Sequence, residues 1–333
     1  QIKNAFSNLR VHIHYSAKAS NNHHILKLLI DAGAGIDAVS GGEIFLALNA
    51  GCNPENIVFA GVGKTPDELR YAIDNRVGWI NIENVAEIDL IDVITGELNY
   101  PPTKIALRLN PEVTANTHPY IATGHGGAKF GLTALTIAEL LAQQENYPNV
   151  NFAGIHVHIG SQLHDTSATI KAIGSAINLI EPYPHIRTIN IGGGLPVAYS
   201  PQDKMPAIEE FAHDIAKLLI DYDVILEPGR AIVADAGLLI TKVLYVKQQA
   251  GQTFYIVDAS MSELIRPALY QAHHEIVSLN AHDEQLLNPA NVVGPVCETA
   301  DVLGRDINLP ELQAGDLVAV LTTGAYGMVM ASN

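Results

Sequence analysis

The chain reads Thr188-Ile189-Asn190-Ile191-Gly192-Gly193-Gly194-Leu195-Pro196, a short apolar run that leads directly into three glycines. The run has the length and composition of a buried strand. Glycine tolerates positive φ and allows close approach of a neighbouring backbone or ligand. The three glycines therefore predict either a tight strand-to-helix turn or a loop whose N–H groups hold a phosphate.

Two further strand ends carry groups that complement this loop. Lys18 follows the apolar run 11–16, and Glu227 follows the run 224–226, just before Pro228-Gly229-Arg230. Pyridoxal phosphate requires an amine for its aldehyde, N–H groups for its phosphate and a carboxylate for its ring nitrogen. Together the three segments favour a pyridoxal phosphate site, although each alone has an ordinary interpretation as a surface lysine, a turn or a cap.

Apolar patterns of strand period and helix period alternate along most of the chain. Strands are predicted at residues 11–15, 36–39, 57–60, 78–82, 105–109, 153–159, 188–191 and 224–226. Helices are predicted at residues 23–31, 42–50, 66–75, 85–95, 135–145, 167–180 and 208–219. Strict alternation specifies a parallel sheet, and eight repeats close a (β/α)8 barrel. A doubly wound open sheet is the main alternative.

The positions of the candidate cofactor-binding residues favour the barrel over the open sheet. Active sites of (β/α)8 barrels lie at the carboxyl ends of the strands, and phosphate sites favour the loops after strands seven and eight. The glycines follow predicted strand seven, and Glu227 follows predicted strand eight. We therefore predict an α/β fold with a TIM-like (β/α)8 barrel.

The pattern changes after residue 236. Short strand-like runs at 238–246, 253–257, 275–279, 292–293 and 317–321 have few helical intervals between them, which is typical of a β domain. We predict a barrel domain at 1–235 and a β-sandwich or β-barrel domain at 236–333, with one long loop at 110–127. Both chain ends look truncated.

The composition argues against several classes of partner. Lys and Arg number 19 against 35 Asp and Glu, which gives a net charge of -16, and 48% of the residues are hydrophobic. A strongly acidic protein repels nucleic acid and anionic membranes, and no apolar stretch reaches the length of a membrane span. The two cysteines, Cys52 and Cys297, lack a paired spacing. We expect a cytoplasmic protein that binds neither nucleic acid nor membrane.

Four histidines require separate interpretation. His156 and His158 face the same way in a strand; we interpret His156 as a core residue and His158 as a ring that stacks on a flat cofactor. His12 and His14 resemble the His-x-His start of metal-dependent hydrolases on such barrels. That alternative needs an aspartate where Glu227 stands and a lysine or histidine on the fourth strand, which has neither. We therefore predict no metal.

The chain resembles the alanine-racemase-fold pyridoxal phosphate decarboxylases over nearly its whole length. The resemblance rests on YSAKA at 15–19, VSGGE at 39–43, HVHIGS at 156–161, GGGLP at 192–196 and EPGR at 227–230. Within that group, VDA at 257–259, IRPALY at 265–270, GPVCE at 294–298 and GAYG at 324–327 are similar to diaminopimelate decarboxylases. The resemblance implies an alanine racemase-like barrel, followed by a β domain that contributes to the substrate site and to a dimer interface.

The resemblance also implies roles for individual residues. The catalytic residues would be Lys18, which holds the cofactor, and Cys297, which donates a proton. The other cofactor-binding residues would be His158, Ser161, Gly192, Gly193, Gly194, Glu227, Gly229, Arg230 and Tyr326. The substrate-binding residues would be Arg230, Arg266, Tyr270, Glu298 and Tyr326. In the family, Cys297 and Glu298 reach the active site of the opposite subunit, which implies a homodimer with shared sites.

The implied activity is pyridoxal phosphate-dependent decarboxylation of meso-2,6-diaminopimelate to L-lysine, the last step of lysine biosynthesis. A decarboxylase of another basic amino acid (ornithine, arginine or lysine) on the same fold is one alternative, but the ornithine and arginine enzymes usually have an aspartate where this chain has Glu298. Catalytically inactive relatives lack the lysine or the cysteine, and this chain has both Lys18 and Cys297. These two alternatives remain open at the level of sequence.

Overall fold

The computed structural model describes residues 1–113, 124, 127–280 and 286–332, and it divides into two compact units. The barrel unit comprises Gln1–Pro196 and Met205–Gly229, and the β unit comprises Val197–Lys204 and Arg230–Asn333. The sequence analysis predicted the boundary after residue 235, whereas this division lies between Gly229 and Arg230 and also places residues 197–204 in the β unit. Most of the predicted loop at 110–127 lies outside the described residues.

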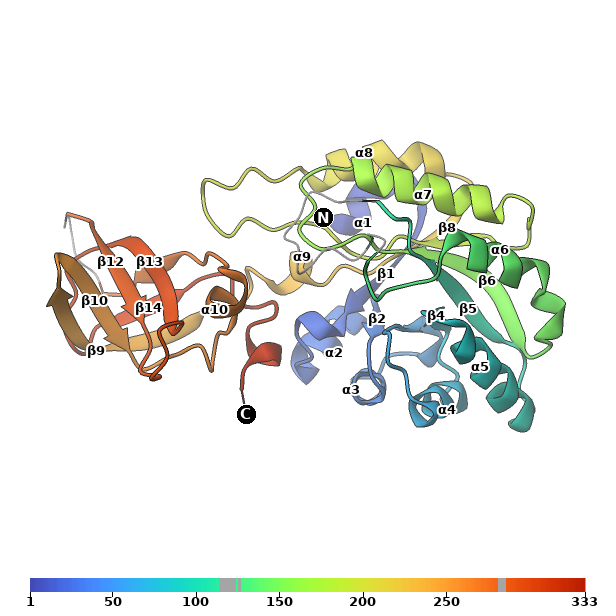
Figure 1. The fold of residues 1–333 in the computed structure, drawn as a ribbon, viewed down its shortest axis with the longest axis horizontal. Helices are drawn as coiled ribbons and strands as arrows, with labels where there is room; N and C mark the ends of the chain where they lie inside the picture. The colour runs from blue at the N-terminus through green and yellow to red at the C-terminus, as the bar shows by residue number, and fades with distance from the viewer. Residues whose placement is uncertain (114–123, 125–126, 281–285, 333) are drawn as a thin grey trace. The chain divides into compact units, whose positions relative to one another are not determined.

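Among the described residues, eight parallel strands close into a barrel (Figure 1). They are β1 (Arg10–Ser16), β2 (Gly35–Ala38), β3 (Ile57–Phe59), β4 (Trp79–Ile82), β5 (Thr103–Leu109), β6 (Val150–Val157), β7 (Thr188–Asn190) and β8 (Asp223–Leu226). β1 pairs with β2 through His14 and Gly35, and with β8 through His12 and Ile225. Because the first strand pairs with the last, the predicted barrel is confirmed and an open sheet is excluded.

Helices connect the strands and surround the barrel (Figure 1). They are α2 (His23–Asp31), α3 (Gly41–Asn49), α4 (Pro66–Asp74), α5 (Val85–Glu97), α6 (Ala134–Ala142), α7 (Ser167–Ile180) and α8 (Ile208–Leu219), with the short α1 (Ile2–Ala5) before them. In α4, Thr65 and Glu68 each accept a hydrogen bond from the other's backbone N–H, which satisfies donors that a helix start leaves free. Leu69 and Ile73 form its buried side. The predicted helices are confirmed to within a few residues.

The β unit is built, in the described part of the chain, on a six-stranded sheet of order β11-β14-β9-β10-β12-β13. Its elements are α9 (Arg230–Val233), β9 (Leu239–Gln249), β10 (Gln252–Val257), α10 (Arg266–Tyr270), β11 (Ile276–Ser278), β12 (Asn288–Val293), β13 (Val302–Leu309) and β14 (Leu317–Val320). The pairing of β10 with β12 is parallel, and the other pairings are antiparallel. Val243, Tyr255 and Val292 are among its buried core residues. The predicted β domain is confirmed as a mostly antiparallel sheet.

The sequence analysis missed β13 because the apolar alternation of this strand is interrupted. Asp306 has a positive φ of 50°, and a Cβ on Gly304 would lie 2.7 Å from Ile307 Cγ1. The pairing of β13 with β12 also shifts register between Ala290 and Val292. A bulged strand loses the period of two on which strand prediction depends.

Gly78, directly before β4, allows a test of backbone packing in the barrel. A Cβ at this position would lie 2.0 Å from the backbone oxygen of Glu55, so Gly78→Ala forces the backbone apart. We expect the substitution to cost about 2 kcal/mol and to lower the melting temperature by several degrees.

Gly174 in α7 provides the matched control, since its Cβ would meet nothing within 4 Å. Gly174→Ala is expected to stabilise the protein by up to about 1 kcal/mol, because alanine favours a helix more than glycine does. Thermal unfolding followed by circular dichroism measures the change in stability for both substitutions. Equal effects of the two substitutions would contradict the backbone contact at Gly78.

Candidate active site

Buried polar side chains gather at the carboxyl ends of the barrel strands, where active sites of this fold lie. Asp37 lies in β2, Asn81 in β4 and Asn190 in β7, and Glu227 directly follows β8. Each of the four is at most 5% exposed. Buried polar groups are costly unless they have hydrogen-bond partners. Their positions therefore imply a connected polar site.

Glu227 is the centre of this polar site. The side-chain amides of Asn81 and Asn190 both donate to its Oε1, over 3.1 Å and 2.5 Å. His156 Nε2 lies 3.6 Å from Oε2, and burial holds the pKa of His156 well below its usual range, so that this imidazole is neutral. In the described part of the chain, no lysine or arginine forms an ion pair with Glu227.

The surroundings of Glu227 change its acidity. Burial raises the pKa of the Glu227 carboxyl to about 7, and the negative charge of Asp37 acts in the same direction. The charge of Lys18 and the bonds from the two asparagines oppose this shift. A cation placed against the carboxyl would favour its charged form. A protonated pyridine nitrogen is one such cation.

Lys18 lies beside Asp37 on the turn that follows β1. Its Nζ is 3.3 Å from Asp37 Oδ2, and its side chain is 38% exposed, whereas that of Asp37 is fully buried. Ser16 Oγ lies 2.6 Å from the same Oδ2 atom and 3.0 Å from the backbone oxygen of Glu227. Ser16 therefore links Asp37, the ion-pair partner of Lys18, to the backbone of Glu227. Lys18 itself presents an accessible amine.

Lys64 differs from Lys18 in its surroundings. Its buried Nζ lies 3.0 Å from Glu87 Oε2 and donates to the backbone oxygens of Gly61, over 2.6 Å, and Asn81, over 2.8 Å. Three such bonds use all three protons of the ammonium group. Lys64 thus has a structural role, and Lys18 is the better candidate for covalent chemistry.

The glycine loop at 192–194 lies close to its neighbours. Gly192 and Gly194 have positive φ angles of 67° and 99°. A Cβ on Gly193 would lie 2.5 Å from the backbone oxygen of Glu227, and one on Gly192 would lie 2.5 Å from His158 Nδ1. Because only glycine fits such positions, the loop brings bare backbone to the site.

His158 packs against this glycine loop. Its Nδ1 accepts a hydrogen bond from Gly193 N over 3.3 Å, so this ring nitrogen is unprotonated. Gly192 N donates to Asn190 Oδ1 over 2.8 Å, which leaves the N–H group of Gly194 as the candidate in this loop for phosphate binding. Ser161 lies just beyond β6 and is partly buried.

Gly229 brings the loop after β8 against the turn that carries Lys18. A Cβ on Gly229 would lie 2.9 Å from Ser16 Cβ and 3.1 Å from Ala19 Cβ. The two segments are therefore in direct contact. The absence of a side chain at Gly229 allows Lys18 and Glu227 to share one end of the barrel.

A second group of predicted residues lies together in the β unit. Arg230 Nη1 donates to Tyr199 Oη over 2.6 Å, and its guanidinium carbon lies 4.8 Å from the ring centre of Tyr326. The guanidinium carbon of Arg266 lies 4.6 Å from the ring centre of Tyr199. Burial lowers the pKa of Arg266 from its usual value, and Tyr270 also interacts with its charge. Two buried cations around one tyrosine are suited to an anionic group.

Cys297 and Glu298 lie in the connection between β12 and β13, and both are exposed. Of the predicted cofactor residues, Arg230 and Tyr326 lie in the β unit and the others lie in the barrel unit. The predicted carboxylate-binding residues Arg230, Arg266 and Tyr270 all lie in the β unit. The structure leaves the proposed proton donor and its neighbour on the surface of the β unit.

Comparisons with known proteins place the chain in a family. Residues 1–234 match the family described as pyridoxal-dependent decarboxylase, pyridoxal binding domain. Diaminopimelate decarboxylases of Aquifex aeolicus and Vibrio cholerae are each 42% identical to the chain, over 96% of its length and 77% of theirs. The chain belongs to the diaminopimelate decarboxylase family. The crystal structure of the Helicobacter pylori family member complexed with L-lysine aligns with a TM-score of 0.94 and 39% identity, covering 99% of this chain and 84% of that one.

The barrel site of this diaminopimelate decarboxylase family member fits pyridoxal phosphate. Lys18 offers an accessible amine, the glycine loop offers backbone without side chains, and Glu227 offers a buried carboxyl without a cationic partner in the described residues. Asn81 Oδ1 and both ring nitrogens of His156 are also buried without hydrogen bonds among those residues. Unpaired buried groups of this kind are typical of functional sites.

Sequence reasoning missed several members of the site. Asp37, Asn81 and Asn190 each stand alone among apolar residues near the carboxyl end of a strand, and this pattern could have identified them. Tyr199 and His274 lie in connections that have no periodic pattern, so no comparable signal marks them.

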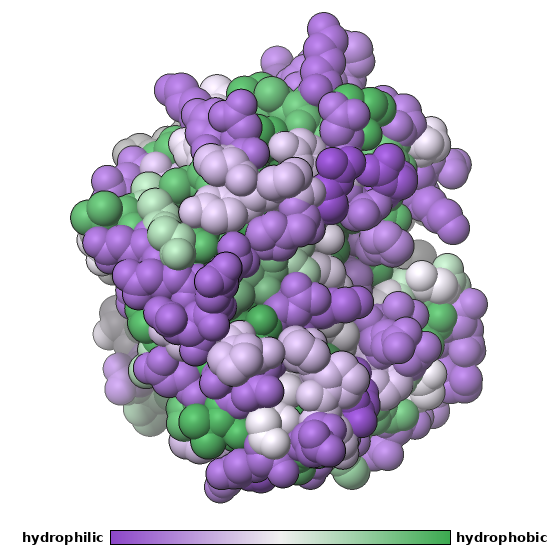
Figure 2. Space-filling view, turned by 90° about the vertical axis from the view of Figure 1, so that its right-hand side faces the viewer, coloured by the Kyte–Doolittle hydropathy of each residue, from purple (hydrophilic) through white to green (hydrophobic). Residues whose placement is uncertain are grey.

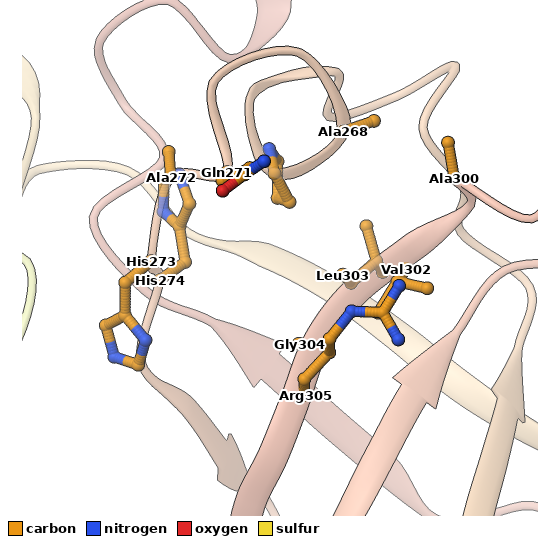
Figure 3. Close-up of a pocket in the computed structure, with 11 residues that line it drawn as sticks. Ala268, Gln271, Ala272, His273, His274, Ala300, Val302, Leu303, Gly304 and Arg305 are labelled. Atoms are coloured by element: carbon orange, nitrogen blue, oxygen red, sulfur yellow. The ribbon is translucent and has the colours of Figure 1, made fainter. Parts of the chain in front are cut away.

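A pocket of about 530 Å³ lies in the β unit beside α10 and β13 (Figure 3). It is lined by Pro267, Ala268, Gln271, Ala272, His273, His274, Ala300, Val302, Leu303, Gly304 and Arg305. None of the predicted site residues lines it. One of its lining residues, His274, also contacts Arg266 Nη1.

The face of the molecule in Figure 2 is mostly hydrophilic, and apolar side chains occur there in scattered patches. No helix among the described residues is long and apolar enough to cross a membrane. Within the same residues, no group of three or more His, Cys, Asp or Glu side chains is arranged to hold a metal ion.

We expect Asn81→Leu to raise the pKa of the Glu227 carboxyl in the cofactor-free protein above its value of about 7. The amide of Asn81 donates to Oε1, and a donor to the charged form lowers a carboxyl pKa, so its removal shifts the pKa upward. Infrared difference spectroscopy of the protonated carboxyl band against pH measures this shift. Asn151→Leu, at an exposed position of β6, should leave the titration unchanged, and an unchanged titration in Asn81→Leu would contradict the assigned bond.

Proposed function

We propose that this protein is a pyridoxal phosphate-dependent enzyme that decarboxylates meso-2,6-diaminopimelate to L-lysine. The observation that carries this proposal is the buried Glu227 carboxyl beside the accessible amine of Lys18 and the glycine loop. The similarity to diaminopimelate decarboxylases over 96% of the chain supports the same activity. The free cysteines Cys52 and Cys297 suit a reducing compartment, which supports a cytoplasmic location.

Bound pyridoxal phosphate supplies a ring that accepts the electrons left on the α-carbon when carbon dioxide departs. Lys18 would bind the aldehyde carbon through its amine. Glu227 would hold a proton at the ring nitrogen, and His158 would stack on the ring. The phosphate would be bound by Ser161, Gly194 and the backbone of Gly229 and Arg230, with the side-chain-free backbone of Gly192 and Gly193 beside it. Tyr326 would contact both cofactor and substrate.

The charge state of Glu227 is suited to decarboxylation. A carboxylate at the ring nitrogen keeps that nitrogen protonated and makes the ring a stronger electron acceptor. The two asparagine amides favour the charged carboxylate, against the effect of burial. Asn81 and Asn190 would therefore support the electron-accepting role of the cofactor without contacting the substrate.

Diaminopimelate carries a second amino acid group far from the reacting carbon. Its carboxylate requires a cation, for which we propose Arg230 and Arg266, with Tyr270 as a further contact through its hydroxyl group. Its ammonium requires an anion, for which we propose Glu298. Cys297 would deliver a proton to the α-carbon after carbon dioxide has left.

We further propose that the protein is a homodimer with shared active sites. Cys297 and Glu298 carry chemistry yet are exposed on the β unit of a single chain. A partner subunit that covers this surface would bring both residues into its own site. The β unit would then contribute to the substrate site and to the dimer interface.

Lys18→Ala is expected to abolish the borohydride-reducible attachment of pyridoxal phosphate and the visible absorption of the protein. Lys64 cannot replace Lys18, because its amine is buried and fully bonded. Peptide mass spectrometry after reduction locates the label. Lys129→Ala, at an exposed lysine, should label normally, and a label on Lys64 or Lys129 in the unmodified protein would refute the assignment.

The unmodified protein should release carbon dioxide from diaminopimelate at least about 100-fold more efficiently than from ornithine, arginine or lysine. Substrates without a distal carboxylate leave a buried arginine unpaired, which costs on the order of 3–5 kcal/mol. Comparable kcat/KM for ornithine or arginine would overturn the substrate assignment and favour the alternative of another basic amino acid decarboxylase.

Glu298→Ala should reduce diaminopimelate turnover far more than it reduces pyridoxal phosphate affinity. The reason is that Glu298 is proposed to bind the distal ammonium and not the cofactor. Glu311→Ala, at another exposed glutamate of the β unit, should change neither. Equal effects of the two substitutions on turnover would contradict a role for Glu298 in substrate binding.

Lys18→Ala and Cys297→Ala proteins, each inactive alone, should regain partial activity when mixed under conditions that allow subunit exchange. One of the two composite sites in a mixed dimer would then contain both residues. Mass spectrometry of isotope-labelled subunits verifies the exchange. Mixtures that exchange but remain inactive would show that sites are not shared in this way.

A further inference from the structure

Arg266 is held by a histidine whose protonation is fixed by its own hydrogen bonds. His274 Nδ1 lies 2.9 Å from the backbone oxygen of Leu321, and its Nε2 lies 2.9 Å from Arg266 Nη1. A carbonyl oxygen can only accept a hydrogen bond and a guanidinium can only donate one. Nδ1 therefore carries the proton and Nε2 the lone pair, so the His274 imidazole is neutral.

The surroundings of His274 maintain this neutral state. His274 is only 1% exposed, and burial lowers the pKa of its imidazole to about 4, with a further lowering by the charge of Arg266. Protonation would place a donor against a donor and a cation against a cation. Near neutral pH the residue therefore stays an acceptor for Arg266.

Tyr199 holds Arg266 from another side, again without a charge. The guanidinium carbon of Arg266 lies 4.6 Å from the Tyr199 ring centre, and the Tyr199 and His274 rings meet edge to face with centres 5.1 Å apart. In the part of the chain that the structure describes, no carboxylate forms an ion pair with Arg266, although it is only 6% exposed. A buried charge without a counter-charge destabilises a fold, and an anionic ligand would remove that cost.

We propose that His274 is a positioning residue that holds Arg266 through a neutral acceptor and so keeps its charge available to the substrate carboxylate that is retained in L-lysine. This inference rests on the proposed function and deepens it. A carboxylate at position 274 would also orient Arg266, but it would neutralise the charge that the ligand needs. The neutral acceptor, and not merely a hydrogen bond, is the property that matters.

Three substitutions of His274 separate its effect on the orientation of Arg266 from its effect on the charge of Arg266. His274→Gln retains a neutral acceptor for Arg266 and a donor for Leu321, His274→Leu removes both, and His274→Glu retains an acceptor but adds a counter-charge. The measurement is calorimetric binding of L-lysine to the pyridoxal phosphate-loaded protein. 1,5-Diaminopentane, which has the same two amines without the carboxylate, is the reference ligand.

We expect His274→Leu and His274→Glu to weaken L-lysine binding by about tenfold to 100-fold, with binding of 1,5-diaminopentane changed less than about twofold. His274→Gln should bind L-lysine within a few-fold of the unmodified protein. L-Lysine binding to His274→Glu at unmodified strength would overturn the charge argument. The Gln and Glu substitutions remain decisive if the Leu substitution prevents folding.

His273 provides the matched control, because its side chain is exposed and lies next to His274 in the chain. His273→Leu should change neither ligand's affinity, and melting temperatures of all proteins identify a general loss of structure. An unmodified protein that neither binds L-lysine nor releases carbon dioxide from diaminopimelate would reject the proposed function itself. An active unmodified protein with insensitive His274 substitutions would reject only this inference.

Discussion

The buried carboxyl of Glu227 is the constraint on which the barrel site depends. A carboxylate removed from water costs several kcal/mol unless protein groups replace its hydration. Asn81 and Asn190 supply two donors to a single oxygen, and hydrogen bonds to a charged group contribute about 1.5–3 kcal/mol each. The pKa of the carboxyl nevertheless remains raised to about 7, and a cation placed against the carboxyl would favour its charged form. The neutral His156 near the second oxygen adds no such charge.

In the β unit, neutral side chains likewise surround buried charged groups, but there the charges are positive. Arg230 and Arg266 are buried around Tyr199, and His274 orients Arg266 without neutralising it. In both units, neutral partners fix the geometry of a charged group while leaving its charge for a ligand. Such preorganised charges are effective in binding and catalysis because they need little reorganisation when the ligand arrives.

Local rules are sufficient for much of the fold because the elements of the barrel repeat one pattern. The α7 range Ser167–Ile180 and the α8 range Ile208–Leu219 agree with the ranges predicted from apolar periodicity. The strand β13 was missed, because Gly304 and the positive φ of Asp306 interrupt its alternation. Its place in the sheet is fixed by packing against β12, which periodicity along the chain does not register.

The sequence by itself determined the alternating α/β pattern and the three strand ends that carry Lys18, the glycine loop and Glu227, because these depend on neighbouring residues and on residue type. Only the tertiary structure decided which groups surround them. Asn81 reaches Glu227 from β4, and Asn190 reaches it from the neighbouring strand β7. His274 reaches Arg266 from beyond the end of α10. Closure of the barrel brings together residues that are far apart in the chain, and burial then sets their charges, so neither effect can be read from a local pattern.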